Sequence, residues 1–276
     1  MSLIRIWLLP FVLLAALLTG CASDPKNPQL SERQYYQEAQ DAIEHNNLTQ
    51  AIDRLQGLES RYPFGRYAAQ AKLDLIYCHY RSLDYESASA TAERFINTYP
   101  DHPQLDYAYY MKGLSSYSVD RGLLERFIPS DFTERDMGPA RESFEDFNRL
   151  INRFPNSPYA ADARQRMVYL RNLLAAYELK AANFYMRRGA YVAAANRGRY
   201  VVENFDTTPS VPAALVVMAK AYAELGLDDL KQSAVEVLKT NFPDNSALND
   251  KGQLDYVPGK RGKRSLLNVV SFGLLD

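Results

Sequence analysis

Apolar residues recur at helical spacing from about residue 31 to residue 248 of the 276-residue chain, and no stretch alternates apolar and polar residues as a strand would. Four aromatic-proline pairs interrupt this pattern, and a fifth site keeps the aromatic residue but has aspartate in place of proline. The sites are Tyr62-Pro63, Tyr99-Pro100, Phe154-Pro155, Phe205-Asp206 and Phe242-Pro243. Because proline cannot continue a helical hydrogen-bond ladder, each pair predicts the end of a helix.

The residues before these five sites also agree with one another. An apolar residue stands four positions before each aromatic residue, and a small residue stands eleven positions before four of the five. The apolar residues are Leu58, Phe95, Leu150, Val201 and Leu238, and the small ones are Ala51, Ala88, Ser143 and Ala194, with Lys231 as the exception. The sites are 37, 55, 51 and 37 residues apart, and their residue order resembles the second helix of a tetratricopeptide repeat. We therefore predict an all-α fold, a tetratricopeptide-repeat solenoid of five helical hairpins.

The two long intervals require extra residues. In the third repeat the excess falls at residues 118–138, which break the helical pattern and predict a loop insertion. In the fourth repeat no glycine or proline follows Pro158 until after Arg188, and apolar residues are spaced alternately by four and three. This stripe consists of Ala163, Met167, Leu170, Leu174, Tyr177, Ala181 and Phe184. It predicts one unbroken helix of about 45 Å.

The N-terminal residues 1–20 have the features of a secretion signal: a positive charge, an apolar run, and small residues before Cys21. The string "LTGC" resembles the lipobox of bacterial lipoproteins, in which the chain is cut before the cysteine and the cysteine is acylated. That resemblance implies lipid attachment at Cys21. Since Ala22-Ser23 lacks the aspartate that commonly retains lipoproteins at the inner membrane, it also implies the periplasmic face of the outer membrane. The alternative is an ordinary signal peptide with a chance cysteine.

These patterns divide the chain into six segments. We predict a signal peptide at 1–20, the lipidated cysteine and a tether at 21–30, repeats one and two with the start of repeat three at 31–117, the loop at 118–138, the end of repeat three with repeats four and five at 139–248, and a flexible tail at 249–276. The tail combines a basic run, "KRGKR", with an apolar end. It is interpreted either as a solubilising linker or as a segment that docks on a partner.

Composition and spacing exclude several classes of function. Removing Arg5 with the signal leaves 31 of the 32 basic residues against all 33 acidic ones, a balance of −2 that does not favour nucleic acid. The three histidines are far apart, and neither a Gly-x-Ser-x-Gly string nor phosphate-loop spacing occurs. Cys78 stands among apolar residues, which indicates a buried side chain rather than a nucleophile. We therefore predict no enzyme, cofactor or metal.

Tyrosines are concentrated in the N-terminal half, where twelve of the 20 lie between residues 35 and 117. The first helices of such repeats line the concave face, so residues at helical intervals there form a candidate aromatic and polar groove. Its predicted members are Tyr67, Asp74, Tyr77 and Arg81. The alternative is that the tyrosines fill wedges between helices.

Three longer strings carry a more specific resemblance: "RYPFGRYAAQAKLDLIYCHY", "HPQLDYAYYMKGL" and "RFPNSPYAADA". Together with the lipobox and the loop in the third repeat, they resemble the BamD (ComL) family, the tetratricopeptide lipoproteins of the β-barrel assembly machinery, over roughly residues 20–245. The resemblance implies a non-catalytic scaffold. Its partners would be a POTRA domain of BamA at the C-terminal repeats, the other lipoproteins of the complex, and unfolded outer-membrane proteins at the N-terminal repeats.

Site residues follow from this resemblance. Tyr67, Asp74, Tyr77 and Arg81 would bind clients, and Arg197 in the string "AAANRGRY" would contact BamA, with Arg187 and Arg188 adding positive charge nearby. The alternative for Arg197 is a solvated arginine. The alternative for the whole chain is a tetratricopeptide lipoprotein of another envelope machine, such as a secretin pilot, against which the "YPFG" and "LDLIY" strings argue.

Overall fold

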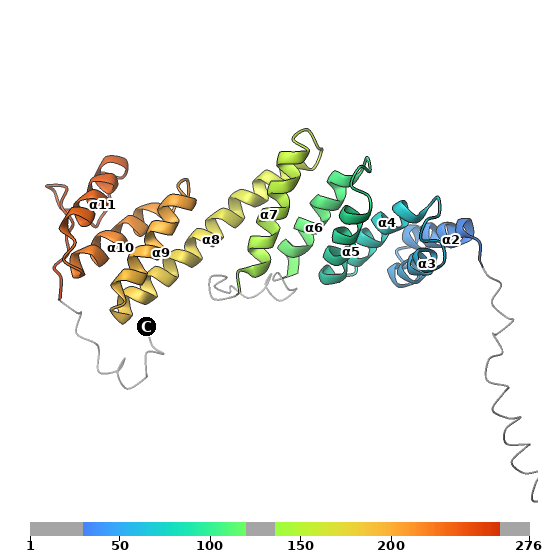
Figure 1. Cartoon of the computed structure of the whole chain (residues 1–276), viewed down its shortest axis with the longest axis horizontal. Helices are drawn as coiled ribbons and strands as arrows, with labels where there is room; N and C mark the ends of the chain where they lie inside the picture. Colours follow the sequence, from blue (N-terminus) through green and yellow to red (C-terminus); the bar gives the residue numbers. More distant parts are fainter. Residues whose placement is uncertain (1–29, 120–135, 260–276) are drawn as a thin grey trace, which may run out of the picture. The chain divides into compact units, whose positions relative to one another are not determined.

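The computed structural model describes residues 30–119 and 136–259, and within these ranges the chain forms ten helices and no strand (Figure 1). The helices are α2 (Glu32–Glu44), α3 (Leu48–Arg61), α4 (Ala68–Arg81), α5 (Tyr85–Thr98), α6 (Leu105–Val119), α7 (Gly138–Arg153), α8 (Ala160–Arg188), α9 (Tyr191–Asn204), α10 (Val211–Glu224) and α11 (Asp228–Asn241). The predicted all-α fold of five hairpins is confirmed. The signal peptide, Cys21, most of the tether, residues 120–135 of the predicted loop and residues 260–276 of the tail lie outside the described residues.

The chain divides into two compact units, one up to Ala71 and one from Lys72, so the boundary falls within α4. The first unit contains the α2–α3 hairpin. In the second unit, successive helices from α5 to α11 pack against one another in chain order, and α8 also contacts α10 (Figure 1).

All five aromatic sites end a helix in the same way. The aromatic residue is the C-cap, its N–H donates to the carbonyl of the apolar residue four positions earlier, and its own carbonyl accepts an N–H three positions later. Phe205, which precedes Asp206, makes both bonds without a proline, donating to Val201 at 2.9 Å and accepting from Thr208 at 3.0 Å. The aromatic residue is therefore the feature common to all five helix ends, and proline, where it is present, reinforces the termination of the helix.

The small residues lie where helices approach closely. Ala51, Ala88, Ser143 and Ala194 are all fully buried. Ser143 Oγ also donates to the Gly113 carbonyl of α6 at 2.8 Å, so its hydroxyl is satisfied inside the interface. Lys231, the predicted exception, is partly exposed on the terminal helix α11.

The fourth repeat contains the predicted long helix, α8, of 29 residues, which ends at Gly189 in a left-handed conformation with φ 76°. Leu170 and Leu174 of the predicted stripe are buried, but Phe184 at its end is 45% exposed. Glu178 and Ala182 are buried there instead. The prediction was wrong at this end because a mean spacing of 3.5 residues drifts against 3.6 residues per turn, and because this half of α8 packs on α9 and α10.

The first part of the predicted flexible tail is held against α10. Leu248 and Leu254 form an isolated bridge, and the Tyr256 hydroxyl and the Gly259 N–H both donate to Glu224 Oε1 near the end of α10. Lys220 lies 5.4 Å from the centroid of the Tyr256 ring. Sequence periodicity did not reveal this contact, because it joins residues 32 positions apart. We call residues 249–259 the strap.

Candidate binding surfaces

Three of the four predicted client-binding residues lie on one face of α4. Arg81 donates to the Tyr77 hydroxyl at 2.6 Å, and its guanidinium carbon lies 5.5 Å from the centroid of the Tyr77 ring. Asp74 is one turn before Tyr77 and is partly exposed, as Tyr77 is. The face therefore presents a carboxylate, a phenol ring and a guanidinium in a row.

The aromatic surface continues from α4 onto α6 and the start of α8. Burial, and then the nearby Tyr159, Asp74 and Tyr77, raise the pKa of Tyr107 on α6. The Tyr107 and Tyr159 ring centroids are 5.7 Å apart, and Tyr110 stacks on Tyr159 at 4.8 Å with an interplanar angle of 18°. These phenols stay neutral at physiological pH, so they offer rings and hydroxyl groups rather than charge.

Charged groups at the α8 end of this surface are paired with one another. The Tyr110 hydroxyl donates to Asp162 at 2.8 Å, and Arg166 Nε donates to the same carboxylate at 2.6 Å. Burial and the bond to Asp162 raise the pKa of Tyr110 to about 12. The Arg166 guanidinium lies 4.9 Å from the Tyr117 ring centroid, so the pattern of ring, carboxylate and guanidinium seen on α4 recurs here.

We call this set the tyrosine surface. Its members are Asp74, Tyr77, Arg81, Tyr107, Tyr110, Tyr117, Tyr159, Asp162 and Arg166. The members on α6 and α8 were missed from sequence, although the strings "DYAYYMKG" and "SPYAADARQR" contain them. Its tyrosines are partly buried, so each ring has a packed part and an exposed part.

Tyr67, the fourth predicted residue, belongs to the first unit. Its ring stacks on Tyr36 of α2 at 4.5 Å with an interplanar angle of 15°. Its backbone N–H donates to Glu32 Oε1 at 2.6 Å. Tyr67 therefore closes the open end of the α2–α3 hairpin.

Arg197, the predicted contact to BamA, is engaged within the chain. Its guanidinium lies 2.6 Å from Glu178 of α8, and Arg141 of α7 lies 3.1 Å from the other carboxylate oxygen. The Glu178 side chain is 3% exposed and that of Arg197 is 45% exposed. The bond to Glu178 raises the pKa of Arg197. Arg197 thus neutralises a buried carboxylate while its side chain stays partly exposed, and Glu178 is the member that sequence reasoning missed.

Arg187 and Arg188 are exposed in the last turn of α8. Arg188 lies 5.3 Å from the centroid of the Phe184 ring, which is itself 45% exposed. Val192, beyond the Gly189 turn on α9, is 60% exposed. The turn between α8 and α9 therefore carries exposed apolar groups beside two positive charges.

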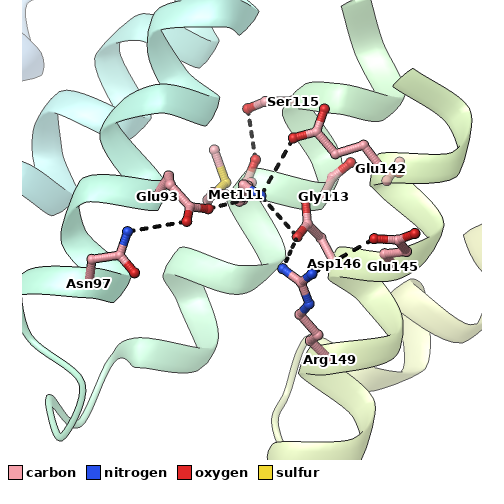
Figure 2. Close-up of polar contacts among 11 residues, drawn as sticks. Glu93, Asn97, Met111, Gly113, Ser115, Glu142, Glu145, Asp146 and Arg149 are labelled. Carbon is pink, nitrogen blue, oxygen red and sulfur yellow. Dashed lines mark hydrogen bonds and ion pairs between the residues drawn. The ribbon is translucent and has the colours of Figure 1, made fainter. Parts of the chain in front are cut away.

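A buried charge cluster joins α5, α6 and α7 (Figure 2). Lys112 of α6 lies 2.9 Å from Glu93, 3.1 Å from Asp146 and 3.5 Å from Glu142. Arg149 adds a second contact to Asp146 at 3.5 Å. Burial raises the pKa of Asp146 to about 6, and Lys112 offsets only part of that effect.

A cleft of about 560 Å³ opens beside this cluster. It is lined by Glu86, Ser89, Ala90, Glu93, Lys112, Ser116, Val119, Pro139, Glu142 and Arg149. Two of the acidic wall residues, Glu93 and Glu142, form ion pairs with Lys112. The cluster therefore acts as a clamp between three helices rather than as a set of free groups for a ligand.

The described residues contain no constellation suited to nucleophilic or metal chemistry. Cys78 is fully buried, and burial, together with Asp74, raises its pKa to about 12, so it is a neutral thiol at physiological pH. No three His, Cys, Asp or Glu side chains gather as metal ligands across 30–119 and 136–259. None of the helices in these ranges is long and apolar enough to cross a membrane.

Comparison with known proteins agrees with this architecture. Residues 28–238 match the family model of YfiO, described as outer membrane lipoprotein. An outer membrane protein assembly factor BamD from Vibrio cholerae is 39% identical over 231 residues, covering 83% of this chain and 96% of the relative. The chain belongs to the BamD family. A BamD protein from Neisseria meningitidis serogroup A is 38% identical over 254 residues, covering 90% of this chain and 95% of the relative.

Membership of the BamD family makes this protein an outer membrane protein assembly factor. A solved structure, a tetratricopeptide repeat protein from Parabacteroides merdae, covers 78% of this chain and 68% of its own, with 10% identity and a TM-score of 0.35. The fold assignment rests on the five hairpins and their common helix ends.

Proposed function

We propose that this protein is a non-catalytic scaffold of the outer-membrane β-barrel assembly complex. In this proposal it is held at the periplasmic face of the outer membrane by lipid on Cys21, binds a POTRA domain of BamA and the other lipoproteins of the complex, and receives unfolded outer-membrane proteins. Membership of the BamD family supports the complex, and the relatives' names as assembly factors favour it over a secretin pilot. No nucleic acid is expected as a partner.

The tyrosine surface carries the proposal for client binding. Unfolded outer-membrane proteins expose aromatic side chains and unpaired backbone amides. Rings such as Tyr77 and Tyr107 can stack on the former, while the Asp162 carboxylate and the Arg81 guanidinium can bond the latter. Because contacts of this kind tolerate many sequences, the surface suits a scaffold that must accept different clients.

Photo-crosslinking tests this assignment. A photoreactive residue in place of Tyr77 or Tyr110 should capture an unfolded outer-membrane protein, whereas one in place of Asn148, which is exposed on α7, should not. Tyr77→Phe keeps the ring but removes the hydroxyl that accepts from Arg81, so it should retain more capture than Tyr77→Ala. Equal capture at Asn148 would place client binding elsewhere.

The turn between α8 and α9 supports the proposal for BamA binding. Exposed apolar groups surrounded by arginine are typical of the anchors of protein interfaces. Arg187 and Arg188 have no ion pair among the described residues, whereas Arg197 is tied to Glu178. A double substitution of Arg187 and Arg188 by Glu should therefore weaken co-purification with BamA without altering the fold.

Arg197 needs a control that separates binding from folding, because its loss also leaves Glu178 with one partner fewer. Arg197→Lys keeps the charge, and the double change Arg197→Ala with Glu178→Gln removes both members of the pair. If Arg197 contacts BamA directly, the double variant should fold like the parent and still co-purify poorly. Normal co-purification of that variant would limit Arg197 to its internal role.

The anchor is tested by Cys21→Ala. The change should prevent acylation and move the protein from the outer-membrane fraction to the soluble periplasmic fraction. Strains in which BamA is depleted serve as the control, since a partner could otherwise hold the protein at the membrane. Continued membrane association under depletion would contradict the lipobox interpretation.

A further inference from the structure

The most exposed large apolar side chain of the described chain is Phe64, whose relative exposure is 100%. It follows the proline of the first helix end. The other four turns have polar residues at the equivalent place: Asp101, Asn156, Thr207 and Asp244. The turn itself therefore does not require an aromatic residue at this position.

The local structure holds Phe64 in this position. The Gly65 N–H donates to the Tyr62 carbonyl at 3.0 Å, and the Gly65 carbonyl accepts from Ala68 at 3.2 Å. A Cβ on Gly65 would collide with the carboxylate of Glu32, which accepts the Tyr67 N–H. The turn is thus fixed against α2, and its geometry presents the ring to solvent.

Phe64 lies at the end of the hairpin where the N-terminal tether arrives. The Tyr62 hydroxyl donates to the carbonyl of Leu30, the first described residue, at 3.1 Å. Leu30 lies nine positions after Cys21, and an extended chain of that length spans at most about 30 Å. A lipid on Cys21 would keep this turn close to the membrane surface.

Charge is distributed unequally between the two ends of the same hairpin. Three exposed arginines lie at the tether end: Arg33, Arg61 and Arg66. The carboxylates at this end are Glu32, which accepts the Tyr67 N–H, and Glu59 in the last turn of α3, which also has a partner. The opposite end carries Asp41 and Glu44, and the last turn of α2 contains no basic residue.

We propose that the Pro63-Phe64-Gly65 turn is a second membrane contact, in which Phe64 enters the interface of the lipid surface and Arg61 and Arg66 bind phosphate headgroups. Aromatic side chains favour the headgroup level of a bilayer, and arginines beside them are attracted to anionic lipid. One ring alone binds weakly, but a covalent anchor raises its local concentration at the surface. The inference rests on the proposed anchor at Cys21.

A single tryptophan can report on this contact. The sequence has one tryptophan, Trp7, inside the expected signal peptide, so Phe64→Trp places the sole tryptophan of the mature chain in the turn. The acylated variant is reconstituted into vesicles of phosphatidylethanolamine and phosphatidylglycerol, with or without brominated acyl chains. We expect a blue-shifted emission that the brominated chains quench. Glu44→Trp, exposed at the opposite end of α2 about 20 Å away, is the matched control and should not be quenched.

Each outcome has a distinct meaning. Quenching at residue 64 only, which grows with the phosphatidylglycerol fraction and loses that growth in the Arg61→Gln, Arg66→Gln background, supports the proposal. Vesicle-bound protein with no quenching at residue 64, or with equal quenching at both positions, overturns it and leaves the anchor intact. Failure of the protein to stay with the vesicles overturns the anchor and the inference together. Emission that shifts only when BamA or a client is added assigns Phe64 to a protein partner.

Discussion

At the scale of single residues, the main feature of the molecule is buried charge. Asp146 and Glu178 are almost fully buried and belong to separate clusters in the second unit. Each is contacted by two cations, yet Asp146 Oδ2 has no hydrogen-bond partner. A buried carboxylate that is only partly compensated costs folding free energy, so Asp146 should leave a measurable signature in the pH dependence of stability.

We predict that this signature disappears in Asp146→Asn. The folded pKa of about 6 lies above the value for an unfolded chain, so the folded state holds the proton more tightly. The free energy of unfolding should therefore fall as the pH rises through this range, by about 3 kcal/mol at most. Lys112, Glu93, Glu142 and Arg149 are the charged groups that surround this carboxyl group.

Denaturant unfolding between pH 4 and pH 7 checks this prediction. The difference in unfolding free energy between Asp146→Asn and the parent should grow in favour of the variant as the pH rises. Glu145→Gln changes an exposed neighbouring carboxylate and should keep the parent's pH dependence. A pH-independent difference for Asp146→Asn would show that this carboxyl group has an ordinary pKa in the folded protein.

At the scale of helices and turns, local signals were predictable and distant pairings were not. The aromatic helix ends and the buried small residues such as Ala51 and Ala88 follow from spacing, because both belong to a pattern that repeats along the sequence. Glu178 in the α8 stripe and Tyr256 in the strap were missed. Their positions depend on Arg141 and on Glu224, which lie 37 and 32 residues away, and no periodicity records such a pairing.

Helix contacts predict a large effect for Gly198→Ala. A Cβ at Gly198 would lie 3.0 Å from the Ala214 carbonyl oxygen and 2.8 Å from Met218 Cγ, so α9 and α10 would have to separate. We expect a destabilisation of about 1–3 kcal/mol, measured by thermal unfolding. Arg199→Ala, an exposed change on the next residue, should stay within about 0.5 kcal/mol. An unchanged melting temperature for Gly198→Ala would contradict the close packing of these helices.

The strap predicts that the two parts of the tail differ in their effect on stability. Deleting residues 249–276 removes Tyr256 and its bond to Glu224, whereas deleting residues 260–276 keeps it. The longer deletion should cost about 1–3 kcal/mol beyond the shorter one, as expected for a hydrogen bond to a charged acceptor. Tyr256→Phe in the full chain should reproduce part of that loss. Equal melting temperatures for the two deletion variants would show that the strap does not contribute to stability.

At the scale of the whole molecule, the two units should differ in how they open. In repeat proteins stability is a sum of repeat and neighbour terms, and the first unit contains one hairpin. Leu55→Ala removes a fully buried side chain from that hairpin, and Phe147→Leu changes one in the second unit. We expect Leu55→Ala to speed hydrogen exchange in α2 and α3, and Phe147→Leu to lower the main unfolding transition.

Hydrogen exchange measured by mass spectrometry separates these outcomes, since it reports protection helix by helix. The unchanged helices within each variant serve as the internal control. If Leu55→Ala speeds exchange equally from α2 to α11, the chain opens as one cooperative body.

The chain-order packing of the helices also bears on how the protein reaches its folded state. Within the second unit each helix mainly contacts the next one along the chain, so the contact order is low and folding is expected to be fast. A chain that emerges through a membrane from its N-terminal end can complete each hairpin without waiting for later residues. The bond between Tyr256 and Glu224 spans 32 residues and belongs to the last part of the described chain to arrive. Its formation would mark the completion of the described repeats during vectorial folding.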